Sequence, residues 1–410
     1  MKESNKPRPP KRFRPDPFPY HHELELEIES LTNMGQGVAR VDGWVVFVRF
    51  ALPGDKVRAR IYRNDKNFSE ADLIEVLESS ADRVEPKCQL FGRCGGCQYQ
   101  NLSYSKQLEW KQRQVAELID RALDGDYKVE APIPSPVEYG YRSKITPHFQ
   151  KPRKGEDLPI GFLEAARRRI VDVPQCPIAM PAINEEPVRE RERVIRDAGS
   201  FKKGATLLLR AGCDGSVETN PNEIIEENVG GVKFKFIAGG FFQNNPFILE
   251  QFAGHVAAEA SATGAPKLVD AYCGSGFFCL TSAGHFDEAV GIEISEIAAD
   301  WAAQNARANG IENARFIAGS AEAIFEEIEF AGTDCAVVID PPRKGCNDLF
   351  LNQLFKFGAR RVVYVSCNPA TQLRDLEKFL SAGYSINKIQ PFDLFPQTRH
   401  LECVVTLDKS

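Results

Sequence analysis

From Lys267 to the end of this 410-residue chain, segments typical of strands alternate regularly with segments typical of helices. Strands joined by helical crossovers form a parallel sheet with helices on both faces, because each crossover covers the sheet before the chain returns to it. The sequence therefore predicts a doubly wound α/β domain, which we place at residues 236–410. Ligands of such a sheet bind at the carboxyl ends of its strands.

Three further regions precede this domain. Residues 1–20 hold six prolines and six Lys/Arg against two acids, which predicts a flexible basic arm because proline interrupts helices and sheets. Residues 21–80 contain four or five short strands separated by turns, the pattern of a small β-barrel. Residues 81–235 mix strands and helices, which predicts a central α+β region that begins with a cysteine-rich loop.

Composition limits the classes to which the chain can belong. Its net charge is −6, so a nucleic-acid partner has to be met by a local basic patch. No stretch approaches the ~18 uncharged apolar residues of a membrane span, and the N-terminus lacks the apolar stretch of a secretory signal. We therefore expect a cytoplasmic protein without a membrane partner. The eleven cysteines favour metal binding or thiol chemistry over a disulfide framework.

Three of these cysteines lie within ten residues. Cys88, Cys94 and Cys97 are separated by five and two residues, and two adjacent glycines let the backbone turn tightly between the last two. With the distant Cys176 as a fourth ligand, the thiolates suit either tetrahedral zinc or a 4Fe–4S cluster. We favour iron–sulfur, because zinc knuckles usually show two short paired spacings and here the fourth cysteine stands alone.

The segment LVDAYCGSGFF predicts a strand followed by a glycine turn that opens a helix. Gly274 and Gly276 would let a ligand approach the backbone closely, and Glu293, nineteen residues beyond Gly274, ends the next strand, where its carboxylate can accept both ribose hydroxyls. This pair fits a nicotinamide dinucleotide or S-adenosylmethionine. The third glycine of the pyrophosphate fingerprint is replaced by Phe277-Phe278-Cys279, which favours S-adenosylmethionine.

Three chemically active side chains follow at strand ends of the same domain. Asp340 ends a buried strand in DPPR, Cys367 ends the next strand in SCNP, and Glu402 lies between apolar residues in HLEC at the start of the last strand. Each alone has a structural explanation as a strand terminator or a buried residue. Together at one sheet edge they indicate a site.

The cysteine loop, GGFFQNN, DAYCGSG, DPPRKG, VSCNPAT and HLEC together resemble the RNA uracil-5-methyltransferases, and most of all the iron–sulfur members that methylate 23S ribosomal RNA. GQGVARVDGWVVFV and ALPGDKVRARI are similar to the TRAM module, an OB-like RNA-binding β-barrel. The resemblance covers nearly the whole chain after the arm. It implies a Rossmann-like class I methyltransferase domain with S-adenosylmethionine and a 4Fe–4S cluster as cofactors, and RNA as the partner of a monomer.

The resemblance also implies roles for individual residues. The Cys367 thiolate would add to carbon 6 of uracil, and Glu402 would remove the proton from carbon 5 after methyl transfer. Asp340 would touch the donor or hold the target base. The residues expected to bind the methyl donor are Gln243, Tyr272, Gly274, Gly276, Glu293, Ser320 and Asp340. Many members of the family have Asn where this chain has Phe277, so no binding role is carried over to that position.

The target uridine must be flipped or lie in a loop to expose carbon 6. Candidate phosphate contacts are Arg343, Arg142, Lys144 and Arg167–Arg169, and a solvated charge explains each of them equally well. A transfer-RNA T-loop uridine is the alternative substrate. Two other classes stay open at this point, a non-catalytic iron–sulfur RNA-binding protein and a nicotinamide-linked oxidoreductase.

Overall fold

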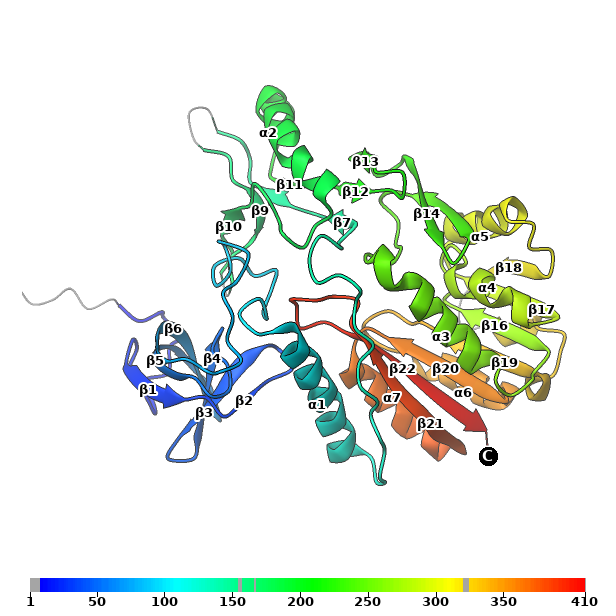
Figure 1. Cartoon of the computed structure of the whole chain (residues 1–410), viewed down its shortest axis with the longest axis horizontal. Helices are drawn as coiled ribbons and strands as arrows, with labels where there is room; N and C mark the ends of the chain where they lie inside the picture. Colours follow the sequence, from blue (N-terminus) through cyan, green and yellow to red (C-terminus); the bar gives the residue numbers. More distant parts are fainter. Residues whose placement is uncertain (1–7, 154–156, 166, 320–323, 410) are drawn as a thin grey trace, which may run out of the picture. The chain divides into compact units, whose positions relative to one another are not determined.

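The computed structural model describes residues 8–153, 157–165, 167–319 and 324–409 (Figure 1). The chain divides into two compact units. Unit 1 comprises Met1–Gln114, Leu163–Arg168 and Gln397–Arg399, and unit 2 comprises Val115–Phe162, Arg169–Pro396 and His400–Ser410. Among the described residues, none of the helices combines the length and the apolar character that a membrane crossing requires. The four-segment division expected from the sequence stays a prediction.

Unit 1 contains one six-stranded sheet. In spatial order its strands are β1 (Glu23–Glu27), β5 (Lys56–Asn64), β6 (Phe68–Glu78), β4 (Trp44–Arg49), β3 (Gln36–Val41) and β2 (Ser30–Leu31). Only β4 and β6 pair in parallel. Along β5 the side chains of Val57, Ala59 and Ile61 are buried, because alternate residues of a strand point to the same face. Closure of this sheet into a barrel stays a prediction.

The proline-rich segment before β1 is attached to this sheet over part of its length. Phe13 and Phe18 pack against the core of the sheet. The Asn64 side-chain amide donates to the backbone carbonyls of Arg14 and Phe18, both at 2.7 Å. Within the expected arm, the part from Phe13 to Phe18 therefore packs on the sheet, because burial of the two rings is favourable. Residues 1–7 lie outside the described residues.

Helix α1 (Tyr104–Ala122) begins in unit 1 and ends in unit 2. Unit 2 continues with short strands in three small sheets and with the charged helix α2 (Glu186–Arg196), close to the helix expected from the sequence. The strands are β7 (Lys144–Ile145), β8 (His148–Phe149), β9 (Ile160–Leu163), β10 (Ile170–Asp172), β11 (Ala205–Thr206), β12 (Leu209–Ala211), β13 (Val217–Glu218), β14 (Ile224–Val229) and β15 (Val232–Ile237).

The rest of unit 2 is a seven-stranded sheet with helices on both faces (Figure 1). Its strands, in spatial order, are β18 (Ala314–Ala318), β17 (Glu288–Glu293), β16 (Lys267–Ala271), β19 (Cys335–Ile339), β20 (Arg361–Ser366), β22 (Glu402–Lys409) and β21 (Tyr384–Phe392). The direction in which strands are added changes at β16, because β17 and β18 lie on one side of it and β19 and β20 on the other. This is the switch point at which open α/β sheets bind ligands.

The predicted α/β sheet is confirmed, with one difference in direction. Strands β16 to β20 are parallel, but β22 runs antiparallel to both of its neighbours. A loop without a helix joins β21 to β22, and two strands joined in that way must run in opposite directions. The start of β22 therefore lies at the same edge as the carboxyl ends of β19 and β20.

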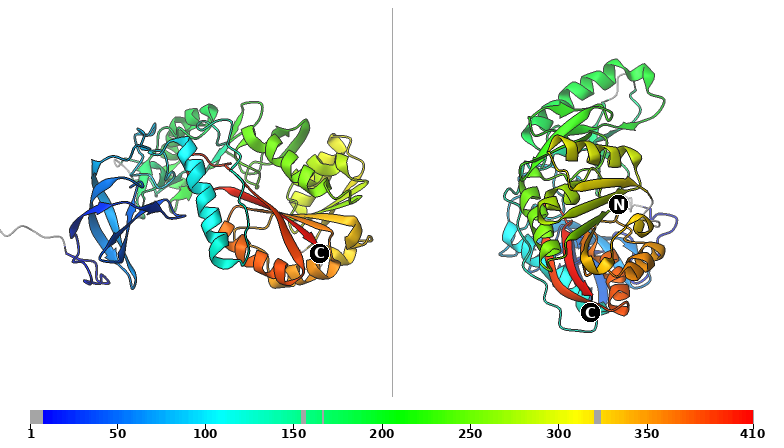
Figure 2. Two further views of the ribbon diagram at one scale, coloured as in Figure 1. Left: turned by 60° about the horizontal axis from the view of Figure 1, so that its bottom comes forward. Right: turned by 90° about the vertical axis from the view of Figure 1, so that its right-hand side faces the viewer.

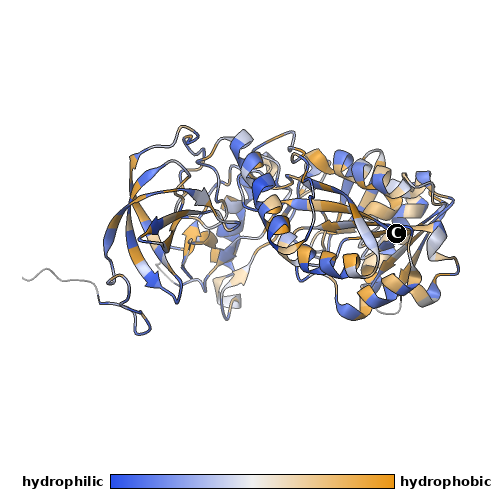
Figure 3. Ribbon diagram, turned by 90° about the horizontal axis from the view of Figure 1, so that it is seen from below, coloured by the Kyte–Doolittle hydropathy of each residue, from blue (hydrophilic) through white to orange (hydrophobic). Residues whose placement is uncertain are grey.

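Buried side chains from alternate strand positions form a separate core on each face of this sheet. One core contains residues of α3 (Leu249–Ser261), α4 (Phe277–Ser282) and α5 (Glu296–Ala308), and the other contains residues of α6 (Asp348–Phe357) and α7 (Pro369–Ser381). Figure 2 shows the sheet with helices on both sides. In Figure 3 these helices are banded by hydrophilic and hydrophobic residues, as expected for helices with one face on a core.

Candidate active site

The turn after β16 has a backbone shape that few residues can adopt. Tyr272, Gly274 and Gly276 all have positive φ, at 68°, 56° and 90°. At Gly276 an added Cβ would also lie 3.0 Å from the Leu280 side chain, so both conformation and space require glycine there. At Gly274 a Cβ would meet nothing within 4 Å, so the approach to the backbone is open on that side.

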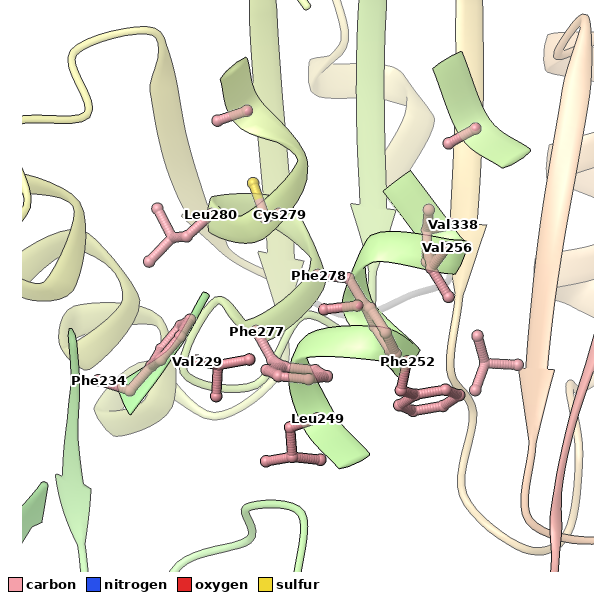
Figure 4. Close-up of a cluster of buried hydrophobic side chains, with 14 of the residues drawn as sticks. Val229, Phe234, Leu249, Phe252, Val256, Phe277, Phe278, Cys279, Leu280 and Val338 are labelled. Carbon is pink, nitrogen blue, oxygen red and sulfur yellow. The ribbon is translucent and has the colours of Figure 1, made fainter. Parts of the chain in front are cut away.

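Phe277, which follows the glycine turn directly, belongs to the core. Its side chain is only 7% exposed, and its ring lies 5.6 Å from the ring of Phe242 and 6.0 Å from that of Phe234, measured between centroids. Figure 4 shows it beside Leu249 and Phe252 of α3. The Phe277 ring therefore anchors the start of α4 in the core on this face of the sheet.

Glu293, at the end of β17, faces the glycine turn. One of its carboxylate oxygens accepts a hydrogen bond from the Gly274 amide at 3.0 Å, and the other accepts one from the Ser295 amide at 2.9 Å. The two bonds hold a half-buried carboxylate over the turn. This is the arrangement in which an acid can accept the two hydroxyls of a ribose.

Two more carboxyl groups lie at this edge of the sheet. Burial raises the pKa of Asp340 to about 7. Asp270, on β16, is 0% exposed, and its pKa is raised well above the usual range first by burial and then by the charges of Asp340 and Glu293. Its Oδ2 accepts from the Cys279 amide at 2.8 Å, while its Oδ1 has no hydrogen-bond partner. Three carboxyl groups so close together favour a cationic ligand.

Cys367 and Glu402 meet next to these carboxyl groups. Ser366 at the end of β20 pairs with Cys403 of β22, and the strands are antiparallel, so Cys367 and Glu402 both lie next to that pair on the side of the sheet edge. Burial raises the pKa of the Cys367 thiol to about 11, and Glu402 and Asp340 add to the rise, whereas the hydrogen-bonded guanidinium of Arg343 opposes it. The thiol is half-buried. The edge of the sheet therefore brings a nucleophile, a carboxyl group and a cation together.

Glu402 itself is only 4% exposed. Burial raises its pKa well above the usual range, Asp340 raises it further, and Arg343 acts in the opposite direction. A carboxyl group in such surroundings takes up a proton far more readily than a solvated one. It is suited to accept a proton during a reaction.

The loop that carries Gln243 is held from several sides. The Asn244 carbonyl accepts from the Ser143 amide at 2.9 Å, and the Asn245 side chain donates to the Ser135 hydroxyl and to the Leu394 carbonyl, both at 3.0 Å. Gln243 is 7% exposed within this loop. Its role in binding the methyl donor stays a prediction.

Lys144 supports the same loop. Its ammonium group donates to the carbonyls of Gly239 at 3.2 Å and Gly240 at 3.0 Å. Burial, and then the charge of Arg210, lower its pKa to about 8. Two of the three ammonium donors are therefore used inside the protein, which argues against the expected phosphate contact for Lys144. Arg142 bonds the Lys144 carbonyl through Nε at 3.1 Å.

The remaining residues of the predicted site are Ser320 and the four cysteines of the expected cluster. Ser320 lies outside the described residues. Cys88, Cys94 and Cys97 are half-buried in unit 1, where turns bond the Cys94 and Phe91 amides to the carbonyls of Leu90 and Cys88. Cys176 belongs to unit 2. The thiols are suitable cluster ligands by their chemistry, but in the described part of the chain no group of three or more His, Cys, Asp or Glu is arranged to hold a metal ion.

The doubly wound sheet, the glycine turn after its switch-point strand β16 and the acid that faces this turn form a nucleotide-type site of the kind that S-adenosylmethionine-dependent methyltransferases use. Comparisons with known proteins identify the family within this class. Residues 222–410 match the family model of tRNA (Uracil-5-)-methyltransferase, and residues 22–74 match the TRAM domain.

Two relatives extend the match over nearly the whole chain. A tRNA (uracil(54)-C(5))-methyltransferase of Schizosaccharomyces pombe is 43% identical, with 96% of this chain and 79% of the relative covered. One of the same name from Saccharomyces cerevisiae is 33% identical, with 95% and 74% covered. The chain therefore belongs to the RNA uracil-5-methyltransferases, which methylate carbon 5 of uridine with S-adenosylmethionine, and it carries a TRAM domain.

A solved structure agrees with this assignment at the level of the fold. The Pyrococcus abyssi tRNA (uracil-54, C5)-methyltransferase, in complex with S-adenosyl-L-homocysteine, superposes with a TM-score of 0.73 over 94% of this chain and 100% of that one, at 24% identity. Membership of a transferase family excludes the oxidoreductase reading and the non-catalytic reading left open by the sequence.

Proposed function

We propose that the substrate of this enzyme is transfer RNA and that the methylated base is uridine 54. The observation that carries the proposal is the 43% identity over 96% of the chain to a relative whose name specifies that nucleotide. The second relative and the protein of similar fold have the same specificity in their names. The expectation of 23S ribosomal RNA has no such support, and transfer RNA, the alternative drawn from the sequence, fits better.

We assign the reaction steps to the residues at the sheet edge. Carbon 5 of uracil is too weak a nucleophile to attack a methylsulfonium unaided. The Cys367 thiolate adds to carbon 6, which forms a carbon–sulfur bond and leaves an enolate with electron density at carbon 5. Carbon 5 then takes the methyl group and S-adenosylhomocysteine is released. Glu402 removes the proton from carbon 5, the carbon–sulfur bond breaks, and the aromatic ring and the thiolate are restored.

The charges around the thiol bear on how readily the thiolate forms. Burial and the Glu402 and Asp340 carboxyl groups oppose thiolate formation, and Arg343 favours it. S-adenosylmethionine carries a positive sulfonium, which would offset the carboxyl charges of Asp270, Glu293 and Asp340 when bound. We infer that the donor thereby promotes thiolate formation, in addition to supplying the methyl group.

The substrate is tested by labelling two RNAs. Purified protein is incubated with isotopically labelled S-adenosylmethionine and either a transfer-RNA transcript or a 23S ribosomal RNA transcript. We expect label in the transfer RNA, mapped by mass spectrometry to 5-methyluridine at position 54, and none in a transcript with cytidine at that position. Label confined to the ribosomal transcript, or label in transfer RNA at another uridine, would contradict the proposal.

We further propose that Cys88, Cys94 and Cys97, with Cys176 as the fourth ligand, hold a 4Fe–4S cluster. The spacing of the thiols supports this, and so do the tight turns between Cys88 and Cys94. The cluster has no step in the reaction above. Protein purified without oxygen is expected to contain iron and acid-labile sulfide, and Cys97→Ser is expected to lose both. Cys213→Ser, which changes an exposed cysteine elsewhere, is the control; equal iron in both variants, or no iron in the wild type, would refute the proposal.

RNA binding by the TRAM domain fits the substrate class. Arg343, Arg142 and Arg167–Arg169 stay predictions as phosphate contacts. The cytoplasmic location and the monomeric state expected from the sequence also stay predictions.

A further inference from the structure

The loop that follows Asp340 is bound to the helix that follows Cys367. Helix α7 begins at Pro369, two residues after the thiol. Two side-chain donors of this region reach the backbone carbonyl of Arg343, the Asn368 amide at 3.1 Å and the Thr371 hydroxyl at 3.0 Å, and this hydroxyl also lies 3.0 Å from the Asn368 carbonyl. The backbone of Arg343 is therefore tied to the segment that carries Cys367.

The next residues of the loop are held by the second turn of α7. The Arg374 guanidinium donates to the carbonyls of Lys344 at 3.1 Å and Cys346 at 3.2 Å. The Cys346 amide donates to Asp375 Oδ2 at 2.8 Å. Gly345 has a φ of +76°, and a Cβ there would lie 2.6 Å from the same carboxylate oxygen. The loop thus fits closely against the helix, while the Arg343 side chain remains exposed.

The position of this side chain bears on the reactive thiol. Among the described residues, the charged groups that act on Cys367 are Glu402 from β22, Asp340 at the end of β19, and the cation Arg343 from the loop. An arginine side chain has many rotamers, and solvent competes for its guanidinium. Its backbone must be fixed if the guanidinium is to stay on the sulfur.

We propose that Asn368 and Thr371 are positioning residues for methyl transfer. By binding the backbone carbonyl of Arg343, they keep the Arg343 guanidinium beside the Cys367 sulfur while the thiolate forms. The inference rests on the proposed role of Cys367 as the nucleophile. It assigns to the start of α7 a function beyond presenting the cysteine.

The test uses Thr371→Val, which removes the hydroxyl and keeps the shape of a half-buried side chain. The rate of covalent adduct formation with a 5-fluorouridine-containing transfer RNA is measured across pH in the presence of S-adenosylmethionine. When the Arg343 guanidinium is held less firmly beside the sulfur, the pKa of the Cys367 thiol rises, so the pH profile of adduct formation moves to higher pH. A shift of about half a unit to one unit lowers the rate below the midpoint by roughly threefold to tenfold. Thr371→Ser is expected to restore the wild-type profile.

Two controls separate positioning from a general structural effect. Ser381→Ala removes an exposed hydroxyl from the far end of α7, where it bonds the Glu377 carbonyl, and should leave the profile unchanged. Arg343→Gln should shift the profile upward by itself, and adding Thr371→Val to it should cause no further shift. Thermal unfolding and S-adenosylmethionine affinity show whether each variant is folded.

A rate that falls by the same factor at every pH in Thr371→Val would overturn the inference, and so would an equal additional shift in the Arg343→Gln background. Absence of any adduct in the wild-type enzyme would overturn the proposed function, and the inference with it. The two failures are therefore distinguishable.

Discussion

Cys367→Ala is expected to abolish methylation of the RNA while leaving the affinity for S-adenosylmethionine unchanged. The thiol supplies the bond that makes carbon 5 nucleophilic, and alanine offers no substitute. Removal of a nucleophile in covalent catalysis costs roughly 10⁴-fold or more in turnover. The donor is expected to be held by the turn around Gly274 and by Glu293, which the substitution does not touch. Labelled-methyl transfer and equilibrium dialysis measure the two properties separately.

Controls for this variant come from the other cysteines of unit 2. Cys213 is exposed, and Cys279 is buried at the start of α4. Cys213→Ala should leave turnover unchanged. Cys279→Ala should lower the thermal stability of the protein, while the folded protein still forms the covalent adduct. With 5-fluorouridine RNA, both should still give an adduct on denaturing gels, and Cys367→Ala should give none. An adduct in Cys367→Ala, or methylation within about a hundredfold of the wild type, would remove Cys367 from the mechanism.

The sequence predicts that Asp340 and Cys367 lie at one sheet edge, because the ends of their strands can be recognised along the chain. The proline pair after Asp340 ends one strand and the start of α7 ends another, and parallel strands must bring both ends to one edge. Glu402 reaches the same edge only because β22 is antiparallel. That direction is not visible in a hydrophobic pattern, which is the same for a strand read in either sense.

Other parts of the site depend on tertiary contacts that no local pattern encodes. Lys144 has the charge of a phosphate contact, but its ammonium group donates to two glycine carbonyls almost a hundred residues away in the sequence. Asp270 lies in an apolar strand, and the acid in LVDAY was the only signal for it. The bond from Thr371 to Arg343 joins two motifs that sequence analysis treats as separate. In each case the role of the side chain depends on the group that it contacts in the folded protein, which the residue type alone does not indicate.

Glu402→Gln is expected to stop the reaction one step later than Cys367→Ala, with a methylated RNA covalently bound to the protein. The amide cannot accept the proton from carbon 5, so elimination of the thiolate slows by about 10²- to 10⁴-fold. Formation of the adduct should not slow, because Glu402 raises the pKa of the Cys367 thiol and a neutral amide does not. The pH profile of adduct formation should therefore move to lower pH, opposite to the shift expected for Thr371→Val.

The measurement uses transfer RNA with ordinary uridine, for which the wild-type adduct is short-lived. Glu402→Gln should accumulate a protein–RNA band on denaturing gels after S-adenosylmethionine is added, and mass spectrometry should find one added methyl group on the bound uridine. Glu377→Gln, at an exposed position of α7, is the matched control and should show no such band. Release of 5-methyluridine RNA at the wild-type rate would show that another group takes the proton. Because Glu402 is nearly inaccessible to solvent, bulk water is a poor substitute for it, and this makes the accumulation the sharper of the two tests.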